Sequence, residues 1–541
     1  MSFLITTIIF ATLAYFVATA YTSRKVIRNL QKQGKPMPPF SWMLGHLHII
    51  KKYVGRFPSD AILNYAALDI FRDYSEHGIF YMDFWPFNVP LLVVGSPFAA
   101  AQVMQHINIP KPVTISDAFL QMTGGPSLIT MPETTWKRWR SIFAPGFSEG
   151  YMLEQVHKIV EVGEIFCAIL RRNAEQGQVF QFEEATIRLA IDVIALIGMD
   201  MKLDYQRQDS MFADGMRSLI DIVTFGAETN LIRRWNPTRP FFVWYYGRII
   251  DATIHRELEK RFSEHNDSFR DSNRAGRYRQ QNKSIVALAL DNHAAGGETT
   301  VIDDEFKRYA TAQIRLFFVT GHDTTSSTIT YAVHLLHKHP KILARVRAEH
   351  DDVFGEDVSA TPRRLVANPN LLNRLPLTLA AIKETLRLFP PAGGARMGSP
   401  DLELISEDGT RFPTANCAIW IMHEAFQRNP AYWPEPDSYI PDRWLVDSSH
   451  PYYPVKGAWR VFESGPRNCI GQTLAIAEMK TVLVLMLREF SIQPAYEEWD
   501  KLHPTTGVKT VDGERAYQVS GGGGGEHPAN QYPCRVTVCQ R

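Results

Sequence analysis

A single cysteine lies in a loop that strongly constrains the fold around it. The segment FESGPRNCIG, residues 462–471, precedes a long apolar stretch with helical character. A cysteine at the start of a helix can be held as a thiolate, because free amide N–H groups and the helix dipole favour negative charge. Gly465 and Gly471 have no side chains, so a flat ligand can lie against this backbone. Arg467, two residues before Cys469, can reach an anionic edge of such a ligand.

This loop resembles the haem-binding signature F-x-x-G-x-R-x-C-x-G of the cytochrome P-450 family, with every fixed position present. The resemblance implies that Cys469 ligates the iron of haem b (iron protoporphyrin IX), and that Phe462, Arg467 and Gly471 contact the cofactor. A thiolate on haem iron favours cleavage of the O–O bond. The alternative is a buried structural thiol, the commoner state of a free cysteine.

Polar residues interrupt an otherwise apolar helical segment at residues 317–326, FFVTGHDTTS. A glycine inside a helix costs about 1 kcal/mol relative to alanine, so we expect a local distortion there. Helical spacing places Gly321 and Thr324 on one face, where Gly321 opens a groove for O₂ or water. Thr324 can donate to and accept from a bound oxygen ligand, and Asp323 can relay protons.

The same segment resembles the family motif A/G-G-x-D/E-T, which implies catalytic roles for Asp323 and Thr324. Thr320 stands where the family usually has a small apolar residue. The alternative is a polar stripe on a surface helix, which the neighbouring Phe317 and Phe318 disfavour.

Glu384 and Arg387 are three residues apart in a helical segment, a spacing that allows an ion pair. Most such pairs are exposed and contribute little. Together with the later Pro441-Asp442-Arg443-Trp444, they resemble the E-x-x-R and proline–arginine–aromatic elements of the family. The resemblance implies that Glu384, Arg387 and Arg443 form a buried network that holds the haem-side loop, a structural and not a catalytic role.

Three more residues resemble haem contacts of the family. The segment WKRWR, residues 136–140, resembles its W-x-x-x-R helix, which implies that Trp136 and Arg140 meet the haem propionates. Arg396 resembles another propionate-contacting arginine, with an ordinary surface arginine as the alternative.

Composition excludes some classes of protein. The 541 residues are 45% hydrophobic, enough for a large core, and length alone would suggest two to four domains. The resemblance implies instead a mainly α fold with small β-sheets in one large domain. A formal net charge of +1 gives no general attraction to nucleic acid. Five scattered cysteines suggest no disulfide framework, which suits a reducing compartment.

Local patterns predict the main secondary structure. Helices are expected over residues 58–75, 302–337, 373–389 and 469–490, and strands within 79–96, 401–420 and 533–538. Loops are expected over residues 270–283, 430–455 and the glycine run 521–525.

Residues 1–23 contain no Asp, Glu, Lys or Arg. Roughly 20 apolar residues span a bilayer, and the basic residues that follow favour a body facing the cytoplasm. The rival interpretation is a cleaved signal peptide, although no positive region precedes the apolar run. We expect an anchor over residues 1–23, a basic, proline-rich hinge over 24–40 and a catalytic domain over 41–541. The resemblance to microsomal members implies a single-pass protein of the endoplasmic reticulum membrane.

No dinucleotide-binding fingerprint and no flavin domain occur in the chain. Electrons are therefore expected from NADPH through a separate reductase, which would dock on the cysteine side against basic residues. The expected docking residues are Lys137, Arg138, Lys456 and Arg460. The aromatic run at residues 241–246 is either a core helix or a segment that dips into the membrane surface.

The resemblance implies a haem-thiolate monooxygenase that inserts one oxygen atom of O₂ into an apolar small molecule. Similarity is greatest to fungal members, including those that tailor polyketide-type secondary metabolites. The expected lining of the substrate pocket is Phe119, Leu120, Phe317, Phe318 and Gly321. Two alternatives are an isomerase or dehydratase that acts without O₂ or reductase, and a non-enzymatic membrane haem binder.

Overall fold

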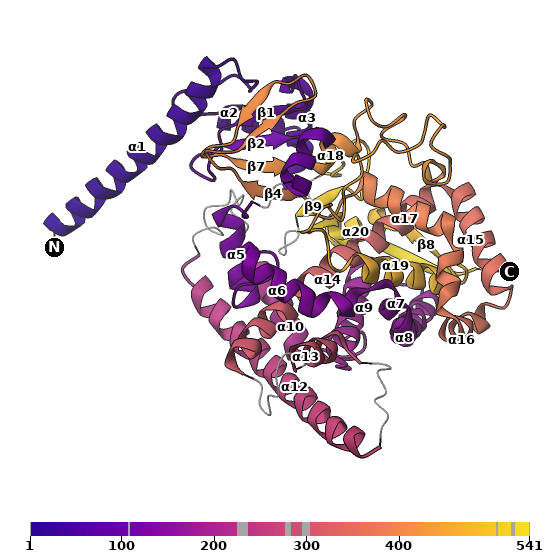
Figure 1. Cartoon of the computed structure of the whole chain (residues 1–541). Helices are drawn as coiled ribbons and strands as arrows, with labels where there is room; N and C mark the ends of the chain where they lie inside the picture. Colours follow the sequence, from indigo (N-terminus) through magenta and orange to yellow (C-terminus); the bar gives the residue numbers. More distant parts are fainter. Residues whose placement is uncertain are drawn as a thin grey trace.

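Helix α14 (Asp304–Lys338) passes through the middle of the molecule, and most of its middle and C-terminal part is buried (Figure 1). Asp303 caps it by accepting a hydrogen bond from the backbone N–H of Phe306, at 2.6 Å. Acidic residues in its first turn and basic residues in its last turn complement the helix dipole. The computed structural model describes residues 2–106, 109–223, 236–275, 283–294, 303–504, 507–520 and 525–539.

Helices pack around α14 and carry most of the core. Its neighbours include α9 (Phe182–Met199), α5 (Val113–Thr123), α17 (Pro376–Leu388) and α19 (Gln472–Met486). The other α-helices of the body are α2 (Leu47–Val54), α3 (Leu63–Tyr74), α4 (Pro97–Ala101), α6 (Glu133–Phe143), α7 (Glu149–Glu154), α8 (Val156–Gln176), α10 (Met211–Ile222), α12 (Arg239–Ala275), α13 (Ile285–Ala294), α15 (Pro340–Phe354), α16 (Thr361–Ala367), α18 (His423–Gln427) and α20 (Tyr496–Leu502).

Short helices of other types join these elements. Residues 102–106 form a π-helical turn after α4. The 3₁₀ turns are Ala144–Phe147, Val358–Ala360, Pro369–Arg374, Pro441–Trp444 and Ala529–Gln531.

The strands form small sheets at the side of the helical body. The four-stranded sheet has the order β1 (Ile79–Met82), β2 (Leu91–Val94), β7 (Ala418–Ile421) and β4 (Gly394–Met397). Strands β2 and β7 are parallel, with Leu91 opposite Ala418, and the other two pairings are antiparallel. The remaining pairings are β3 (Phe180–Gln181) and β8 (Phe490–Pro494) with β11 (Pro533–Val538), β5 (Glu403–Ile405) with β6 (Arg411–Pro413), and β9 (Gln518–Ser520) with β10 (Glu526–Pro528).

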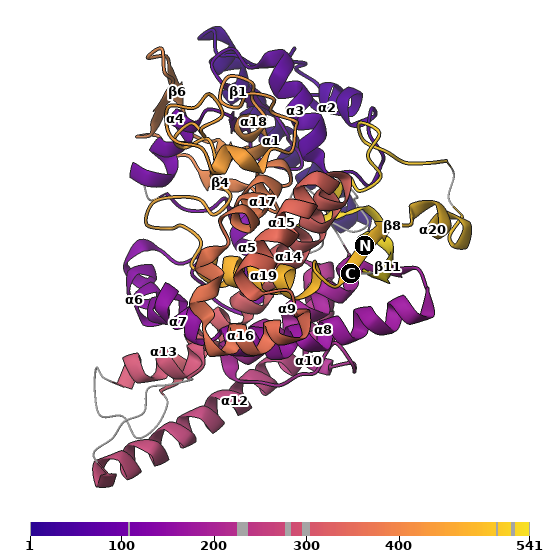
Figure 2. The ribbon, with the colours of Figure 1, turned by 90° about the vertical axis from the view of Figure 1, so that its right-hand side faces the viewer.

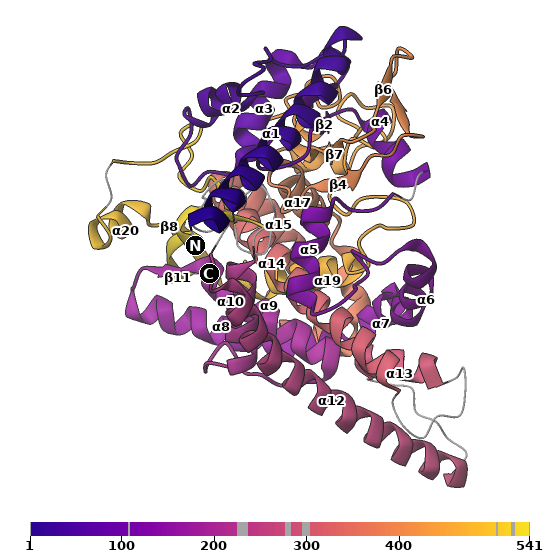
Figure 3. The same cartoon turned by 90° about the vertical axis from the view of Figure 1, so that its left-hand side faces the viewer.

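The mainly α fold with small sheets is therefore confirmed, and most predicted elements are present with shifted ends. Helix α3 begins later than predicted, because residues 58–60 form a turn and Ile62 is extended. Helix α12 continues to Ala275, so the predicted loop at residues 270–283 was placed too early. It extends beyond the helices around it (Figures 2 and 3). Residues 521–524 of the glycine run lie outside the described residues.

Helix α1 (Ser2–Lys32) has two parts with different surroundings. Its N-terminal half is exposed and projects from the body (Figure 1), and Phe3–Lys32 is long and apolar enough to cross a membrane. Phe16 and Tyr21 make ring contacts with Trp85 and Trp42. From Ser23 onwards the helix has side chains buried against the body, where Arg24 forms a buried ion pair with Asp83. The first part of the predicted hinge is thus helical, and irregular backbone begins only after residue 34.

Candidate active site

The cysteine loop ends at the start of α19, as the sequence predicts. The backbone N–H of Cys469 donates to the carbonyl of Phe462 at 2.9 Å, which closes the loop. Glu463 and Gly465 adopt positive φ angles, 55° and 79°, that turn the chain. Cys469 is exposed to solvent. The surrounding chain nevertheless raises the pKa of its thiol by desolvation, while the N–H groups of Gly471 and Gln472 and the charge of Arg140 act in the opposite direction. These groups favour the thiolate that a metal ion needs.

Side chains of helix α6 contact the cysteine loop. Arg140 donates to both the carbonyl oxygen and Oδ1 of Asn468, each at 3.0 Å. The guanidinium of Arg467 lies over the ring of Trp136, 4.8 Å from its centroid, and donates to the carbonyl of Met131. Trp136, Arg140 and Arg467 therefore meet around the cysteine loop, and the contacts of Trp136 and Arg140 with haem propionates stay a prediction.

Positive charge gathers beside the loop. Arg396 is buried on β4 near Arg467, and Lys111 interacts electrostatically with both. Burial is the main reason why the pKa of Arg396 falls to about 10 and that of Lys111 to about 7. Lys111 was missed from the sequence, because a lysine between two prolines matches no motif.

These residues fit haem. Arg467 Nε is buried and has no hydrogen-bond partner among the described residues, as expected of a donor aimed at an anionic ligand. Three cations, Lys111, Arg396 and Arg467, face two nearby carboxylates, Glu463 and Glu133, so an anionic ligand would balance the remaining positive charge. No group of three or more potential metal-binding side chains occurs in the described part of the chain.

Glu463 connects the loop to its support. It accepts from His423 Nε2 at 3.0 Å and from Arg460 at 3.2 Å. Arg460 is only 3% exposed, so the expectation that it docks a reductase was wrong: this guanidinium is occupied inside the protein. Lys137, Arg138 and Lys456 are exposed.

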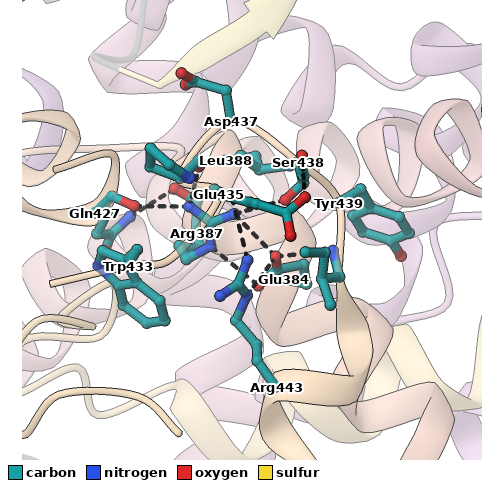
Figure 4. A network of polar contacts seen from close by, with 12 residues as sticks. Glu384, Arg387, Leu388, Gln427, Trp433, Glu435, Asp437, Ser438, Tyr439 and Arg443 are labelled. Atoms are coloured by element: carbon teal, nitrogen blue, oxygen red, sulfur yellow. Dashed lines mark hydrogen bonds and ion pairs between the residues drawn. The ribbon is translucent and has the colours of Figure 1, made fainter. Parts of the chain in front are cut away.

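The predicted structural network is present and fully buried (Figure 4). Arg387 donates to both oxygens of Glu384, at 2.9 and 3.0 Å, and Arg443 donates to Oε1 at 2.9 Å. Trp444 Nε1 and the backbone N–H of Ile440 complete the shell, each at 3.0 Å. Glu384 thus ties α17 to the segment that precedes the cysteine loop.

A cavity of about 470 Å³ lies between α14, α5 and the sheet. From α14 it is lined by Val319, Thr320, Asp323 and Thr324. Apolar residues from other elements, among them Ile115, Phe119, Ile129 and Trp420, form part of its wall. Asp323 and Thr324, the two predicted catalytic residues, therefore face one cavity whose wall has both polar and apolar side chains.

Four of the five predicted pocket residues lie elsewhere. Phe317 packs against Phe143 and Phe147, and Phe318 against Phe212, within the core. Gly321 faces α9, since a Cβ there would lie 3.2 Å from Ile194, and Leu120 is partly exposed. Only Phe119 lines the cavity among them. The reason is helical phase: the face with Val319 and Asp323 turns to the cavity, and the face with Phe317 and Gly321 does not.

Helix α14 remains continuous through the motif, so the expected distortion is not present. Thr324 Oγ1 donates to the carbonyl of Thr320 at 3.0 Å, and Thr320 donates likewise to Leu316 at 2.9 Å. Burial acts to raise the pKa of Asp323, but His527 and the N–H of Gly525 outweigh it and the pKa is lowered. Asp323 is therefore held as a carboxylate at the cavity wall.

The chain is similar to known proteins over most of its length. The family model described as cytochrome P-450 matches residues 38–519. The chain is 36% identical to cytochrome P-450 monooxygenase polC of Polytolypa hystricis, over 97% of this chain and 93% of the relative. It is 30% identical to cytochrome P-450 monooxygenase acrF of Aspergillus aculeatus, over 83% and 92%. The crystal structure of the cytochrome P450DA heme domain matches with a TM-score of 0.69 at 19% identity, over 94% of this chain and 97% of that one.

Proposed function

Since the chain belongs to the cytochrome P-450 family and is a monooxygenase of the haem-dependent type, we propose that it inserts one oxygen atom of O₂ into an apolar organic substrate. Electrons would come from NADPH through a separate reductase. The observation that carries the proposal is the position of Asp323 and Thr324 on the wall of a partly apolar cavity, in a chain whose cysteine loop is built for haem.

The residues of the chain have separate tasks in this proposal. Cys469 would hold the iron, and Lys111, Arg396 and Arg467 would hold the carboxylates of the cofactor. When bound, haem supplies the redox chemistry that activates O₂. Thr324 and Asp323 hold and deliver protons from the cavity wall, since a hydroxyl can both donate and accept while a carboxylate can be reloaded.

The cavity supports a substrate with a largely apolar skeleton. Its volume of about 470 Å³ is in the range of pockets for small organic molecules. Asn64 and Glu526 also line it, so one polar group on the substrate would find partners there. Together with the similarity to fungal monooxygenases, this supports a role in tailoring a polyketide-type or other secondary metabolite.

We further propose a single-pass anchor in the endoplasmic reticulum membrane, with the body facing the cytoplasm. Helix α1 supports it through an exposed apolar half followed by basic residues. The start of α12 supports a second contact with the membrane surface, because Phe241, Trp244 and Tyr245 are exposed and are not part of a core helix. The reductase would dock at Lys137, Arg138 and Lys456, with charge as the main attraction.

Spectroscopy and turnover test the proposal. The reduced protein treated with carbon monoxide should show the red-shifted Soret band of thiolate ligation, and C469S should lose it. Absence of this band in the wild type would refute the haem-thiolate assignment. A library of fungal metabolites is then screened for substrate-induced shifts of the iron spin state. Product should appear only with O₂, NADPH and a reductase, and turnover without them would favour an isomerase or dehydratase.

A further inference from the structure

Three ionisable side chains from distant parts of the chain form a buried line beside the cavity. Glu183 lies in the first turn of α9, Asp323 in α14 and His527 in β10. His527 Nδ1 lies 2.7 Å from Glu183 Oε1, and His527 Nε2 lies 3.0 Å from Asp323 Oδ1. The imidazole ring therefore connects two carboxyl groups, one at each nitrogen.

The surroundings favour a protonated ring. Burial acts to lower the pKa of His527, but the two carboxyl groups outweigh it and raise the pKa well above its ordinary value. A ring that donates from both nitrogens must be an imidazolium. Burial also raises the pKa of Glu183. The contacts thus favour a proton on each nitrogen of His527 and a carboxylate on Asp323.

The other ionisable groups near the His527 ring do not provide the negative charge that stabilises its protonated form. His322 adjoins Asp323 on α14, and burial lowers its pKa. Glu526 precedes His527 on β10, and burial raises its pKa well above the ordinary value. Both shifts favour the neutral forms, so Asp323 and Glu183 remain the groups that set the charge of His527.

Of the three side chains Glu183, His527 and Asp323, only Asp323 is described on the cavity wall. The approach of the chain to Asp323 requires glycine, because a Cβ at Gly525 would lie 2.1 Å from Asp323 Oδ2. The backbone N–H of Gly525 also bonds to Asp323. Asp323 is therefore fixed between the cavity and the imidazole.

We propose that His527 is a positioning residue that orients Asp323 and hands it a proton from Nε2, with Glu183 holding the ring through its contact with Nδ1. The Nε2–H bond of His527 breaks and an O–H bond forms on the Asp323 carboxylate; this O–H bond then breaks as the proton passes to the hydroxyl of Thr324 or to water in the cavity. Nδ1 keeps its hydrogen during this step. The ring is recharged at Nε2 when Asp323, which lines the cavity, takes up a proton from water there and passes it back to the imidazole. No oxidant or reductant takes part, and the inference rests on the monooxygenase function proposed above.

The first experiment measures the ring directly, without turnover. Nitrogen NMR of the protein labelled at histidine, in the reduced carbon-monoxide form, identifies His527 by the signal missing from H527Q. We expect imidazolium shifts at pH values above 6.5, the ordinary histidine pKa. E183Q should make the ring easier to deprotonate. A neutral His527 ring at pH 7 in the wild type would overturn the proposal.

The second experiment measures coupling with the metabolite that gives the largest spectral shift. H527Q should retain haem and NADPH oxidation, but form about tenfold less product per NADPH and more hydrogen peroxide, since a positioned proton donor contributes ~10²–10⁴-fold. E183Q, which leaves the contact to Asp323 intact, should show a smaller loss. Both variants should change the solvent isotope effect and the pH profile of product formation.

H350Q is the matched control. His350 is a buried histidine that bonds to Thr378 and is not among the residues that line the cavity. It should leave coupling, the isotope effect and the pH profile unchanged. If H527Q and E183Q couple as well as H350Q, the proposal fails although the monooxygenase function stands. If the wild type forms no oxygenated product, the proposed function fails, and the NMR result still reports the state of His527.

Discussion

Arg140 forms two hydrogen bonds with Asn468, the residue before Cys469. Its guanidinium donates to both the backbone carbonyl and the side-chain oxygen of Asn468, at 3.0 Å each. A planar guanidinium can make two parallel bonds of this kind, whereas an ammonium group acts as a point charge. The pair therefore orients the peptide that carries Cys469, in addition to any contact with a ligand.

R140K should weaken haem retention although the charge is kept, because one of the two bonds to Asn468 is lost. A hydrogen bond to a charged group contributes about 1.5–3 kcal/mol, so haem loss should be accelerated roughly tenfold or more. The rate of haem transfer to an acceptor protein measures this. R171A is the control, since Arg171 forms a half-exposed surface pair with Glu489. Equal haem loss from R140K and wild type would contradict the assigned role.

E384Q should strongly destabilise the protein. Glu384 is the sole acid among the groups that Arg387 and Arg443 contact in the described network, and all three side chains are fully buried. Removing one member of such a network leaves buried charge uncompensated and costs about 3–5 kcal/mol. Urea unfolding and the yield of haem-loaded protein report the effect.

The surface pair of Glu403 and Arg411 provides the comparison. Both side chains are exposed, 42% and 69%, so E403Q should cost at most about 1 kcal/mol. If E384Q and E403Q unfold at the same urea concentration, the network does not have the structural importance that its burial indicates.

The sequence was informative where a function is encoded within a few residues. The cysteine loop, the Asp323-Thr324 pair and the Glu384-Arg387 pair were all found this way, because their members lie in one loop or one helix. Contacts between members of one such loop or helix could be predicted from their spacing alone. The sequence placed Phe317 and Gly321 on the cavity face, since the phase of a helix relative to its neighbours depends on packing that no local pattern contains.

Partnerships between distant residues could not be predicted. His527 and Glu183 are 344 positions apart, and His423 and Glu463 are 40 apart. Each residue taken alone matches an ordinary polar position. Only the folded chain brings β10 to the start of α9, and Lys111 to Arg396, so these contacts required the structure.

T324A should separate electron consumption from product formation. The hydroxyl of Thr324 bonds to Thr320 within α14 and faces the cavity, so its loss should leave the fold and haem content intact. Product per NADPH should fall about tenfold or more, with hydrogen peroxide in its place, because general acid catalysis contributes ~10²–10⁴-fold. T311A is the control, since Thr311 bonds to Lys307 on the same helix outside the cavity lining. Fully coupled turnover by T324A would contradict its role.

E463Q should remove a pH-dependent part of the stability. Burial acts to raise the pKa of Glu463, but His423, Arg460 and Arg396 outweigh it and hold the pKa at about 2. A carboxyl group whose pKa is lowered in the folded state stabilises the fold at pH values above its ordinary pKa of 4.5. This stabilisation is lost as the pH falls towards 2. The pKa of His423 is raised despite its burial. Its contribution to the free energy of unfolding is therefore complete below pH 6.5, the ordinary histidine pKa, and is lost as the pH rises through the raised pKa.

The difference in stability between wild type and E463Q should therefore be largest between pH 4.5 and 6.5. It should be on the order of 3 kcal/mol, from the size of the lowered pKa. Urea unfolding of both proteins across the pH range measures the two curves. Parallel curves would show that Glu463 is not the group responsible.

Two truncations of α1 should behave differently, although they differ by only six residues. A variant without residues 2–22 removes the exposed apolar half and keeps Ser23 and Arg24, which both bond to Asp83. It should be released from the membrane more readily and retain its melting temperature. A variant without residues 2–28 also removes Arg24 and the buried Ile27. It leaves the Asp83 carboxylate unpaired in the interior, a loss of about 3–5 kcal/mol. Membrane fractionation and thermal unfolding measure both effects, and equal melting temperatures would refute the view that α1 joins the body at Ser23.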